Sequence, residues 1–206
     1  MPIEVKICGM TNSDDVKYAL EYGADYCGFV LYRKSARGIN ATRLEKIISE
    51  INVPFKAVAV FVDEDRDVIQ KISEEAGLYA VQLHGCELPV NYVDFPVPIW
   101  RAIRSMEGEY QPEPSLWKPE RYLVDSTAPG VMGGSGVAAD WKMAADFAAK
   151  RRVMLAGGLT PENVVAAIKQ VRPVGVDVAS GVESKPGLKD RAVMKRFIEN
   201  VKAVRM

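Results

Sequence analysis

Short apolar runs alternate along the chain with segments whose apolar residues recur at helical spacing. A run of about four to eight apolar residues between turn residues is typical of a strand buried on both faces. Eight such runs predict strands at residues 5–8, 26–31, 56–62, 80–83, 99–103 and 122–125, and in the runs that begin at Val153 and Val176.

The intervals between these runs predict helices in most cases. Apolar stripes at helical spacing lie near residues 16–20, 44–51, 68–72, 141–149 and 188–203. After the fifth run the pattern weakens, and Pro112, Pro114 and Pro119 exclude a long helix because proline breaks helical hydrogen bonding. We therefore expect the fifth helix to be reduced.

Strands that alternate with helices predict a parallel sheet. Eight such units close into an α/β fold of the (β/α)₈ TIM-barrel type, in which the active site lies at the C-terminal ends of the strands. The same units could also form an open doubly wound sheet. Because the chain shows no linker and no shift of composition, we predict one domain over residues 1–206.

Two glycine turns lie at the ends of the last two predicted strands. Gly157-Gly158 follows one run, and Ser180-Gly181 follows the next. Glycine lets the backbone approach a ligand, and Thr160-Pro161 is typical of a helix start, where unpaired N–H groups bind anions. Tight turns with no ligand are the alternative interpretation. Because barrels often hold phosphate after strands seven and eight, the pair of turns favours a phosphate site and a closed barrel.

Composition and charge narrow the class of protein. Hydrophobic residues make up 48% of the chain and charged residues 26%, a balance typical of a globular protein. The 27 basic residues equal the 27 acidic residues, which argues against a nucleic-acid or anionic-membrane partner. No apolar run approaches the ~20 residues that span a bilayer. The N-terminal residues show no signal peptide.

The three cysteines are Cys8, Cys27 and Cys86, and they form no CxxC pair. With one histidine in the chain, this pattern argues against a zinc site, and we expect no metal. Reduced thiols fit a cytoplasmic protein. Cys27 and Cys86 are interpreted as having no role in catalysis.

Polar residues follow several predicted strands and would converge at the mouth of a barrel. Cys8 ends the first strand, where nearby positive charge could turn its thiol into a base; a buried, inert cysteine is the alternative. Asp125 ends an apolar run, where a carboxylate is costly without a partner or a purpose. It could act as a general acid or cap the turn at Ser126 and Thr127. Asp177, on the eighth strand, could bind hydroxyl groups or be structural.

Three further positions are candidates for ligand contact. Arg37 could present its guanidinium to a ligand carboxylate, or it could belong to a solvated basic loop. His84 could contact substrate or orient the fourth loop. The glycine-rich segment that contains Gly134 and Ser135 could reach an anion or close as a lid. Other polar residues near strand ends are Asp63, Arg101 and Arg104.

Taken together, these residues resemble the phosphoribosylanthranilate isomerase family of tryptophan biosynthesis. The matching segments span almost the whole chain in order: Lys-Ile-Cys-Gly-Met-Thr at 6–11, Gly-Phe-Val at 28–30 leading to Ser-Ala-Arg at 35–37, Val-Gln-Leu-His-Gly at 81–85, Val-Asp-Ser at 124–126 with Gly-Gly-Ser-Gly at 133–136, Leu-Ala-Gly-Gly-Leu at 155–159, and Val-Asp-Val-Ala-Ser-Gly-Val-Glu at 176–183. The chain departs from the family beside Trp141 and at Cys86, where other residues are common.

The resemblance implies an Amadori rearrangement of N-(5-phosphoribosyl)anthranilate to 1-(o-carboxyphenylamino)-1-deoxyribulose 5-phosphate, an aldose–ketose isomerisation without metal or organic cofactor. Carried over by position, Asp125 is the general acid that opens the ribose ring, and Cys8 is the general base at C2. Arg37 would hold the anthranilate carboxylate, and Asp177 the ribose hydroxyls. The phosphate would meet the backbone at Gly134, Ser135, Gly157, Gly158, Ser180 and Gly181.

Two other functions remain as alternatives. A related aminoaldose-phosphate isomerase of histidine biosynthesis is expected to carry a carboxylate where Cys8 stands. A non-catalytic phosphosugar-binding barrel would keep the phosphate site without needing Cys8 and Asp125 as a pair. The expected partner is the small-molecule substrate, with neither nucleic acid nor membrane, and the chain is expected to be a monomer or a homodimer.

Overall fold

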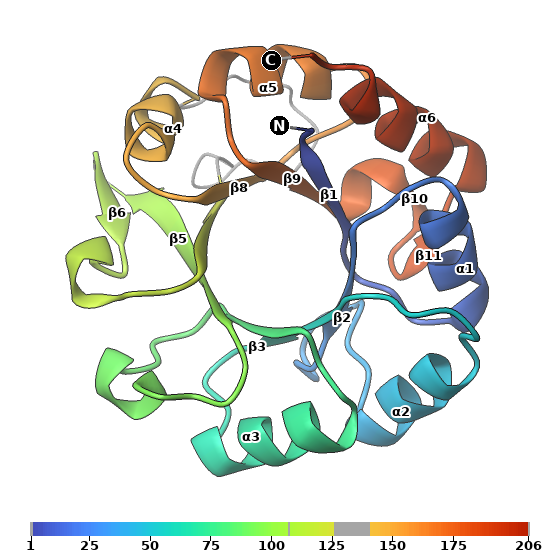
Figure 1. The fold of residues 1–206 in the computed structure, drawn as a ribbon, viewed down its shortest axis with the longest axis vertical. Coiled ribbons are helices and arrows are strands. Elements are labelled where there is room, and N and C mark those ends of the chain that lie inside the picture. Colours follow the sequence, from blue (N-terminus) through green and yellow to red (C-terminus); the bar gives the residue numbers. More distant parts are fainter. Residues whose placement is uncertain (1, 107, 126–140, 206) are drawn as a thin grey trace.

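The computed structural model of the chain describes residues 2–106, 108–125 and 141–205. Parallel strands close into a barrel, because β4 pairs with β5 in addition to β3 and completes the ring (Figure 1). The (β/α)₈ barrel prediction is therefore confirmed. The barrel strands are β1 (Glu4–Ile7), β2 (Tyr26–Val30), β3 (Ala57–Phe61), β4 (Ala80–Leu83), β5 (Ile99–Met106), β7 (Arg121–Asp125), β8 (Val153–Ala156) and β9 (Gly175–Val178).

Helices surround this ring of strands. They are α1 (Ser13–Glu21), α2 (Ala41–Ser49), α3 (Arg66–Glu75), α4 (Trp141–Ala148), α5 (Val164–Val171) and α6 (Arg191–Lys202). Three of them begin at a side-chain cap: the side chains of Asn12, Asn40 and Asp65 accept backbone N–H bonds at the starts of α1, α2 and α3.

Short elements replace helices on the arc between α3 and α4 (Figure 1). The 3₁₀ turn η1 (Pro89–Tyr92) follows β4. After β5, the strand β6 (Glu109–Gln111) turns back antiparallel along β5, and η2 (Pro114–Leu116) follows. The prolines of this segment thus end helical structure as expected, and the reduced fifth helix is a hairpin with a single 3₁₀ turn.

The last predicted helix begins later than expected. Residues 188–189 form β11 (Leu188–Lys189), which pairs antiparallel with β10 (Glu183–Lys185). Asp190 then caps α6 by accepting a hydrogen bond from the N–H of Val193. The apolar residue Leu188 extended the helical pattern by chance, because it belongs to the hairpin that precedes the cap.

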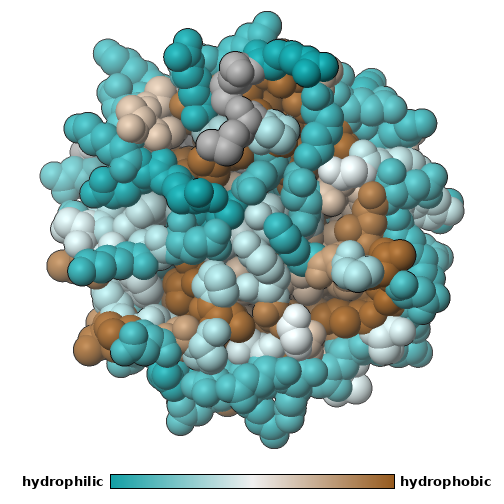
Figure 2. All heavy atoms as spheres, viewed as in Figure 1, coloured by the Kyte–Doolittle hydropathy of each residue, from teal (hydrophilic) through white to brown (hydrophobic). Residues whose placement is uncertain are grey.

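Successive side chains of each barrel strand point outward and inward in turn, so the core has an outer and an inner layer. Outward side chains such as Val5, Ile7 and Phe29 are buried against the helices. Inward side chains fill the barrel, so that the centre of the ring is occupied when all atoms are drawn (Figure 2). Near the N-terminal ends of the strands, the Arg121 guanidinium lies 4.5 Å from the centre of the Trp100 ring. This packing closes one end of the barrel and leaves the other end for a cavity.

Candidate active site

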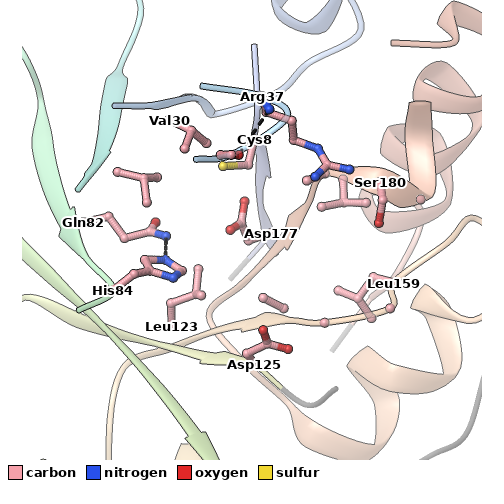
Figure 3. Close-up of a pocket in the computed structure, with 18 of the residues that line it drawn as sticks. Cys8, Val30, Arg37, Gln82, His84, Leu123, Asp125, Leu159, Asp177 and Ser180 are labelled. Atoms are coloured by element: carbon pink, nitrogen blue, oxygen red, sulfur yellow. Dashed lines mark hydrogen bonds between the residues drawn. The ribbon is translucent and has the colours of Figure 1, made fainter. Parts of the chain in front are cut away.

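A cavity of about 410 Å³ lies at the C-terminal ends of the barrel strands (Figure 3). Its walls include the candidate residues of the sequence analysis that fall within the described ranges, except Asp63, Arg101 and Arg104, for which the expected convergence was wrong. The candidate residues that line the cavity are Cys8, Arg37, His84, Asp125, Gly157, Gly158, Asp177, Ser180 and Gly181. Gly134 and Ser135, also predicted to bind phosphate, lie outside the described residues. The fold thus brings together groups from six loops or strand ends.

One side of the cavity is built from the turns after β8 and β9. Gly157 and Gly158 both have positive φ values, 89° and 61°, which glycine adopts without strain. Ser180 and Gly181 begin the 3₁₀ turn η3 (Ser180–Val182). A Cβ built on Gly181 would lie 1.8 Å from the carbonyl oxygen of Leu159, so the two turns touch at a point where no side chain fits. Backbone therefore forms this side of the cavity.

The predicted helix start, with Thr160 as the cap and Pro161 as the first helical residue, is three residues too early. Thr160 instead begins a turn: its hydroxyl accepts from the N–H of Glu162, and Asn163 accepts from the N–H of Thr160 at 2.8 Å. Asn163 also donates to the carbonyl of Gly158 at 2.9 Å. Helix α5 begins only at Val164. The hydrogen bonds of Thr160 and Asn163 thus stabilise the turn that contains Gly158.

Substitution of Gly181 by alanine should separate these two turns. Because the new Cβ would meet backbone rather than a flexible side chain, we expect a loss of about 1–3 kcal/mol of stability from overpacking. Phosphate-containing ligands should also bind more weakly. The measurement is denaturant unfolding with ligand titration by calorimetry. Ser180→Ala, which adds no volume at the neighbouring position, is the matched control for stability. Equal free energies of unfolding for the two variants would contradict the close contact between Gly181 and Leu159.

Cys8 lies directly after β1 and points into the cavity from the inner face of the barrel (Figure 3). Its side chain is buried, with 8% exposure. Burial raises the pKa of the Cys8 thiol above its usual value, and the ammonium group of Lys6 offsets only part of that rise. On this strand Lys6 and Cys8 face the same side, because side chains two residues apart point the same way.

Asp125 ends β7 and lies on the side of the cavity opposite Cys8 (Figure 3). Leu123, two residues earlier on the same face of β7, also lines the cavity. The alternative interpretation of Asp125, a cap through Ser126 and Thr127, concerns residues outside the described ranges. Asp125 and Cys8 thus lie on opposite sides of the same cavity of about 410 Å³.

Asp177 lies between them on β9, and both of its carboxylate oxygens bind the ammonium of Lys6, at 3.0 and 3.1 Å. The two residues are aligned in the parallel pairing of β1 with β9. Lys6 is fully buried and Asp177 is 7% exposed. Asp177 is therefore an ion-pair partner as well as a wall of the cavity.

Arg37 forms an ion pair with Glu183, which lies 146 positions later in the chain. Its Nε and Nη2 donate to the carboxylate of Glu183 at 2.7–3.0 Å. Glu183 also binds the ammonium of Lys189 at 2.9 Å, and Lys189 donates to the carbonyl of Cys8 at 2.5 Å. Burial opposes ionisation of Glu183, but Arg37 and Lys189 hold the pKa of its carboxyl below the usual value. Arg37 is thus a fixed cation at the rim of the cavity.

His84 follows β4 and is hydrogen-bonded through Nε2 to the side-chain amide of Gln82 (Figure 3). Burial lowers the pKa of His84 to about 3, and the charges of Lys6 and Arg101 act in the same direction. The imidazole is therefore neutral near pH 7 and can offer a hydrogen bond but no charge.

Three other strand-end residues lie away from the cavity walls. Asp63 accepts a hydrogen bond from the N–H of Cys86 and joins the loops after β3 and β4. Arg101 faces the outer layer, where it pairs with Glu87 at 2.6 Å. Arg104 lies further along β5 and is exposed.

Sequence reasoning assigned no role to four polar residues of this site, which are Lys6, Gln82, Glu183 and Lys189. Strand alternation could have found the first two, because Lys6 precedes Cys8 by two positions and Gln82 precedes His84 by two. A lysine or glutamine on the inner face of a barrel strand is costly unless it has partners there. Glu183 and Lys189 lie in the β10–β11 hairpin, for which no separate signal was identified.

The described residues contain no group of three or more His, Cys, Asp and Glu side chains placed to hold a metal ion. Within those same ranges, none of the helices has both the length and the apolar character that crossing a bilayer requires.

Comparisons with known proteins agree over nearly the whole chain. A sequence profile for the family described as N-(5'phosphoribosyl)anthranilate (PRA) isomerase matches residues 5–200. The N-(5'-phosphoribosyl)anthranilate isomerase of Pelobacter propionicus is 38% identical over 203 residues, covering 98% of this chain and 97% of that protein.

Solved structures give the same result. The phosphoribosyl anthranilate isomerase of Thermotoga maritima superposes with a TM-score of 0.87 at 36% identity, covering 98% of this chain and 100% of that one. Another such isomerase was solved in complex with reduced 1-(o-carboxyphenylamino)-1-deoxyribulose 5-phosphate. It superposes with a TM-score of 0.83 at 34% identity, with the same coverage.

Proposed function

The chain belongs to the N-(5'-phosphoribosyl)anthranilate isomerase family, and we propose that Cys8 and Asp125 are the base and the acid of its reaction. The enzyme is an aldose–ketose isomerase of tryptophan biosynthesis. Its substrate is the aminoaldose N-(5'-phosphoribosyl)anthranilate. The observation that supports the residue assignment is the position of the thiol and the carboxyl group on opposite sides of one cavity, beside a backbone-lined end.

The first step is ring opening. Asp125 donates a proton to the ribose ring oxygen, the C1–O bond breaks, and the nitrogen lone pair forms an iminium ion with C1. A general acid accelerates such a step because it neutralises charge on the leaving oxygen as that charge develops. The position of Asp125 at the end of β7 supports this role, since barrel enzymes place reacting groups at the C-terminal ends of their strands.

The second step is proton removal at C2. The Cys8 thiolate takes the C2 proton, and the C–H electrons form the C1=C2 bond of an enolamine while the iminium nitrogen becomes neutral. Protonation at C1 and loss of the proton from the C2 hydroxyl then give the ketone. The thiolate is needed because the neutral thiol is a poor base.

The turns after β8 and β9 would hold the phosphate. Gly157, Gly158, Ser180 and Gly181 present backbone there, and backbone N–H groups are suited to phosphate oxygens. Gly134 and Ser135 are proposed to add to this site. A phosphate fixed at this end would orient the ribose between Cys8 and Asp125, so that both proton transfers occur without a change of binding position.

Arg37 and Asp177 would position the remaining parts of the substrate. Glu183 engages Nε and Nη2 of Arg37, and the remaining nitrogen, Nη1, is the donor proposed for the anthranilate carboxylate. Asp177 is proposed to accept hydrogen bonds from the ribose hydroxyls, with Lys6 as its counter-ion. His84, which is neutral, is proposed to contact the substrate by hydrogen bonding.

Arg37→Ala should weaken ligands that contain anthranilate more than simple sugar phosphates. A hydrogen bond to a charged group contributes about 1.5–3 kcal/mol, and the alanine variant loses it for the anthranilate carboxylate only. Calorimetric titration with the reduced product analogue and with ribose 5-phosphate measures the difference. Arg33→Ala, an exposed arginine of the same loop, is the matched control. Equal weakening of both ligands would remove Arg37 from carboxylate recognition.

The family match decides between the isomerase and its two rivals. A non-catalytic phosphosugar-binding barrel would not require the paired thiol and carboxyl group that the cavity contains. The histidine-pathway isomerase is expected to carry a carboxylate at the position of Cys8. A cytoplasmic location, the absence of nucleic-acid and membrane partners, and a monomeric or homodimeric state are part of the proposal.

A further inference from the structure

The ammonium group of Lys6 is buried in the barrel beside the thiol of Cys8. Lys6 has no exposed surface, and its ammonium binds both carboxylate oxygens of Asp177. The Cys8 side chain lies close enough to act electrostatically on the same ammonium group. A buried ammonium is costly unless charged partners surround it, so its position between a carboxylate and a thiol requires an explanation.

The packing around Gly28 shows how close these groups are. A Cβ built on Gly28 of β2 would lie 2.8 Å from Sγ of Cys8 and 2.9 Å from Nζ of Lys6. Both atoms therefore approach the same point on the inner face of the barrel. The glycine leaves the space in which the lysine side chain reaches the thiol, and any larger residue would separate the two groups.

We propose that Lys6 is the positioning residue of Cys8: its buried ammonium orients the sulfur toward the cavity and supplies the positive charge that stabilises the thiolate. Asp177 is one counter-ion of Lys6 inside the barrel, and the Cys8 thiolate is the second, so that Lys6 stays charged beside the thiolate when Asp177 is removed. This inference rests on the proposed role of Cys8 as the base, because a thiolate is needed only if the sulfur removes a proton.

The charges around the thiol act in opposite directions. Burial raises the pKa of Cys8, and Asp177 raises it further, whereas Lys6 and Lys189 lower it. The titratable and charged groups that act on Cys8 from the surrounding elements are Lys6 on β1, Arg37 in the loop after β2, Asp177 on β9 and Lys189 on β11, with Cys27 of β2 nearby in the outer layer. Removal of Lys6 should therefore raise the pKa of the Cys8 thiol, and removal of Asp177 should lower it.

Lys6 itself remains an ammonium at working pH. Burial alone would lower its pKa, but the carboxylate of Asp177 and the Cys8 side chain outweigh burial, and its pKa lies above the usual value. The lysine is thus a permanent positive charge beneath the sulfur. It does not exchange a proton with substrate in this account.

The test is the rate at which iodoacetamide alkylates Cys8 as a function of pH, followed by mass spectrometry of the peptide that contains Cys8. A Cys86→Ser background removes the exposed thiol, and Cys27 is fully buried. Because only the thiolate reacts, the midpoint of the pH profile reports its ionisation. Lys6→Met should raise this midpoint by about one pH unit or more, and Asp177→Asn should lower it.

The opposite shifts of the alkylation midpoint in Lys6→Met and Asp177→Asn distinguish an electrostatic role of Lys6 from a structural one. A residue that only filled space would, when either partner was changed, loosen the site and shift both midpoints the same way. The proposal is overturned if Lys6→Met leaves the midpoint unchanged or lowers it, or if Asp177→Asn raises it.

A double variant covers the case in which Lys6→Met folds poorly around an unpaired Asp177. Lys6→Met with Asp177→Asn removes both charges and leaves no buried carboxylate without a partner. Its alkylation midpoint should lie above that of Asp177→Asn alone, because only the ammonium differs between the two. A midpoint equal to or below that of Asp177→Asn overturns the proposal.

The pH dependence of turnover is a second measurement, independent of the alkylation of Cys8. In Lys6→Met, the rise of kcat/KM with pH should move to higher pH by about the same amount as the alkylation midpoint. If Cys8→Ser keeps normal turnover, the proposed role of Cys8 fails, while the alkylation midpoints still decide whether Lys6 controls the thiol.

Discussion

Cys8→Ser is expected to reduce kcat for N-(5'-phosphoribosyl)anthranilate by about 10²–10⁴-fold, the range that a positioned general base contributes. The serine hydroxyl is smaller than the thiol and fits the same space, but it does not ionise near neutral pH. The loss therefore falls on proton removal at C2 rather than on the shape of the cavity. Stopped-flow recording of the anthranilate fluorescence of the substrate measures it.

Two controls keep this result specific to the sulfur at position 8. Cys86→Ser makes the same chemical change at an exposed cysteine and should retain full turnover. Binding of the reduced product analogue to Cys8→Ser should stay within a few-fold of wild type, because the phosphate and carboxylate contacts are unchanged. Near-normal turnover in Cys8→Ser would show that another group removes the proton.

Asp125→Asn should cause a loss of similar size, about 10²–10⁴-fold in kcat, because the amide cannot donate the proton that opens the ribose ring. The substitution keeps the size of the side chain at the end of β7, so the barrel should remain folded. Rates measured with saturating substrate separate this loss from weaker binding.

The matched control for this charge change is Asp146→Asn on the exposed face of α4, which should leave kcat unchanged. Asp125→Glu provides a further comparison, since it restores an acid in a slightly different position and should recover part of the lost rate. Equal activity of Asp125→Asn and wild type would exclude Asp125 as the acid.

Much of the fold follows from the hydrophobic pattern alone. Strands buried on both faces leave nearly continuous apolar runs, and all eight barrel strands were predicted to within a few residues at each end. The pattern was less informative where local and tertiary signals compete. Leu188 looked helical although it pairs with β10, and Thr160-Pro161 looked like a helix start although the turn continues to Asn163.

Strand-end reasoning placed the candidate residues in one cavity, because parallel strands of a barrel all end at the same face. It could not show which of these residues bind each other. The pairing of Lys6 with Asp177 depends on the register between the first and last strands, 171 positions apart in the chain. The contact of Arg37 with Glu183 likewise joins distant loops. Such pairs are set by tertiary geometry that one sequence does not contain.

These pairs change the electrostatic description of the site. The sequence suggested isolated cations and carboxylates around a ligand, whereas the structure contains two buried ion-pair groups that meet at Cys8. Lys6 with Asp177 approaches the sulfur, and Lys189 with Glu183 approaches the carbonyl of the same residue. In such surroundings the positive charges of Lys6 and Lys189 offset part of the rise in pKa that burial imposes on the Cys8 thiol.

The most direct test of the central claim is turnover of N-(5'-phosphoribosyl)anthranilate by the purified wild-type chain in the presence of EDTA, beside the double variant Cys8→Ser with Asp125→Asn. The account predicts that wild type converts the substrate to the ketose with no added metal or cofactor, and that the double variant falls to the uncatalysed rate while still binding the reduced product analogue. A wild type that binds the substrate without converting it, or a double variant that retains near-normal turnover, would contradict the account.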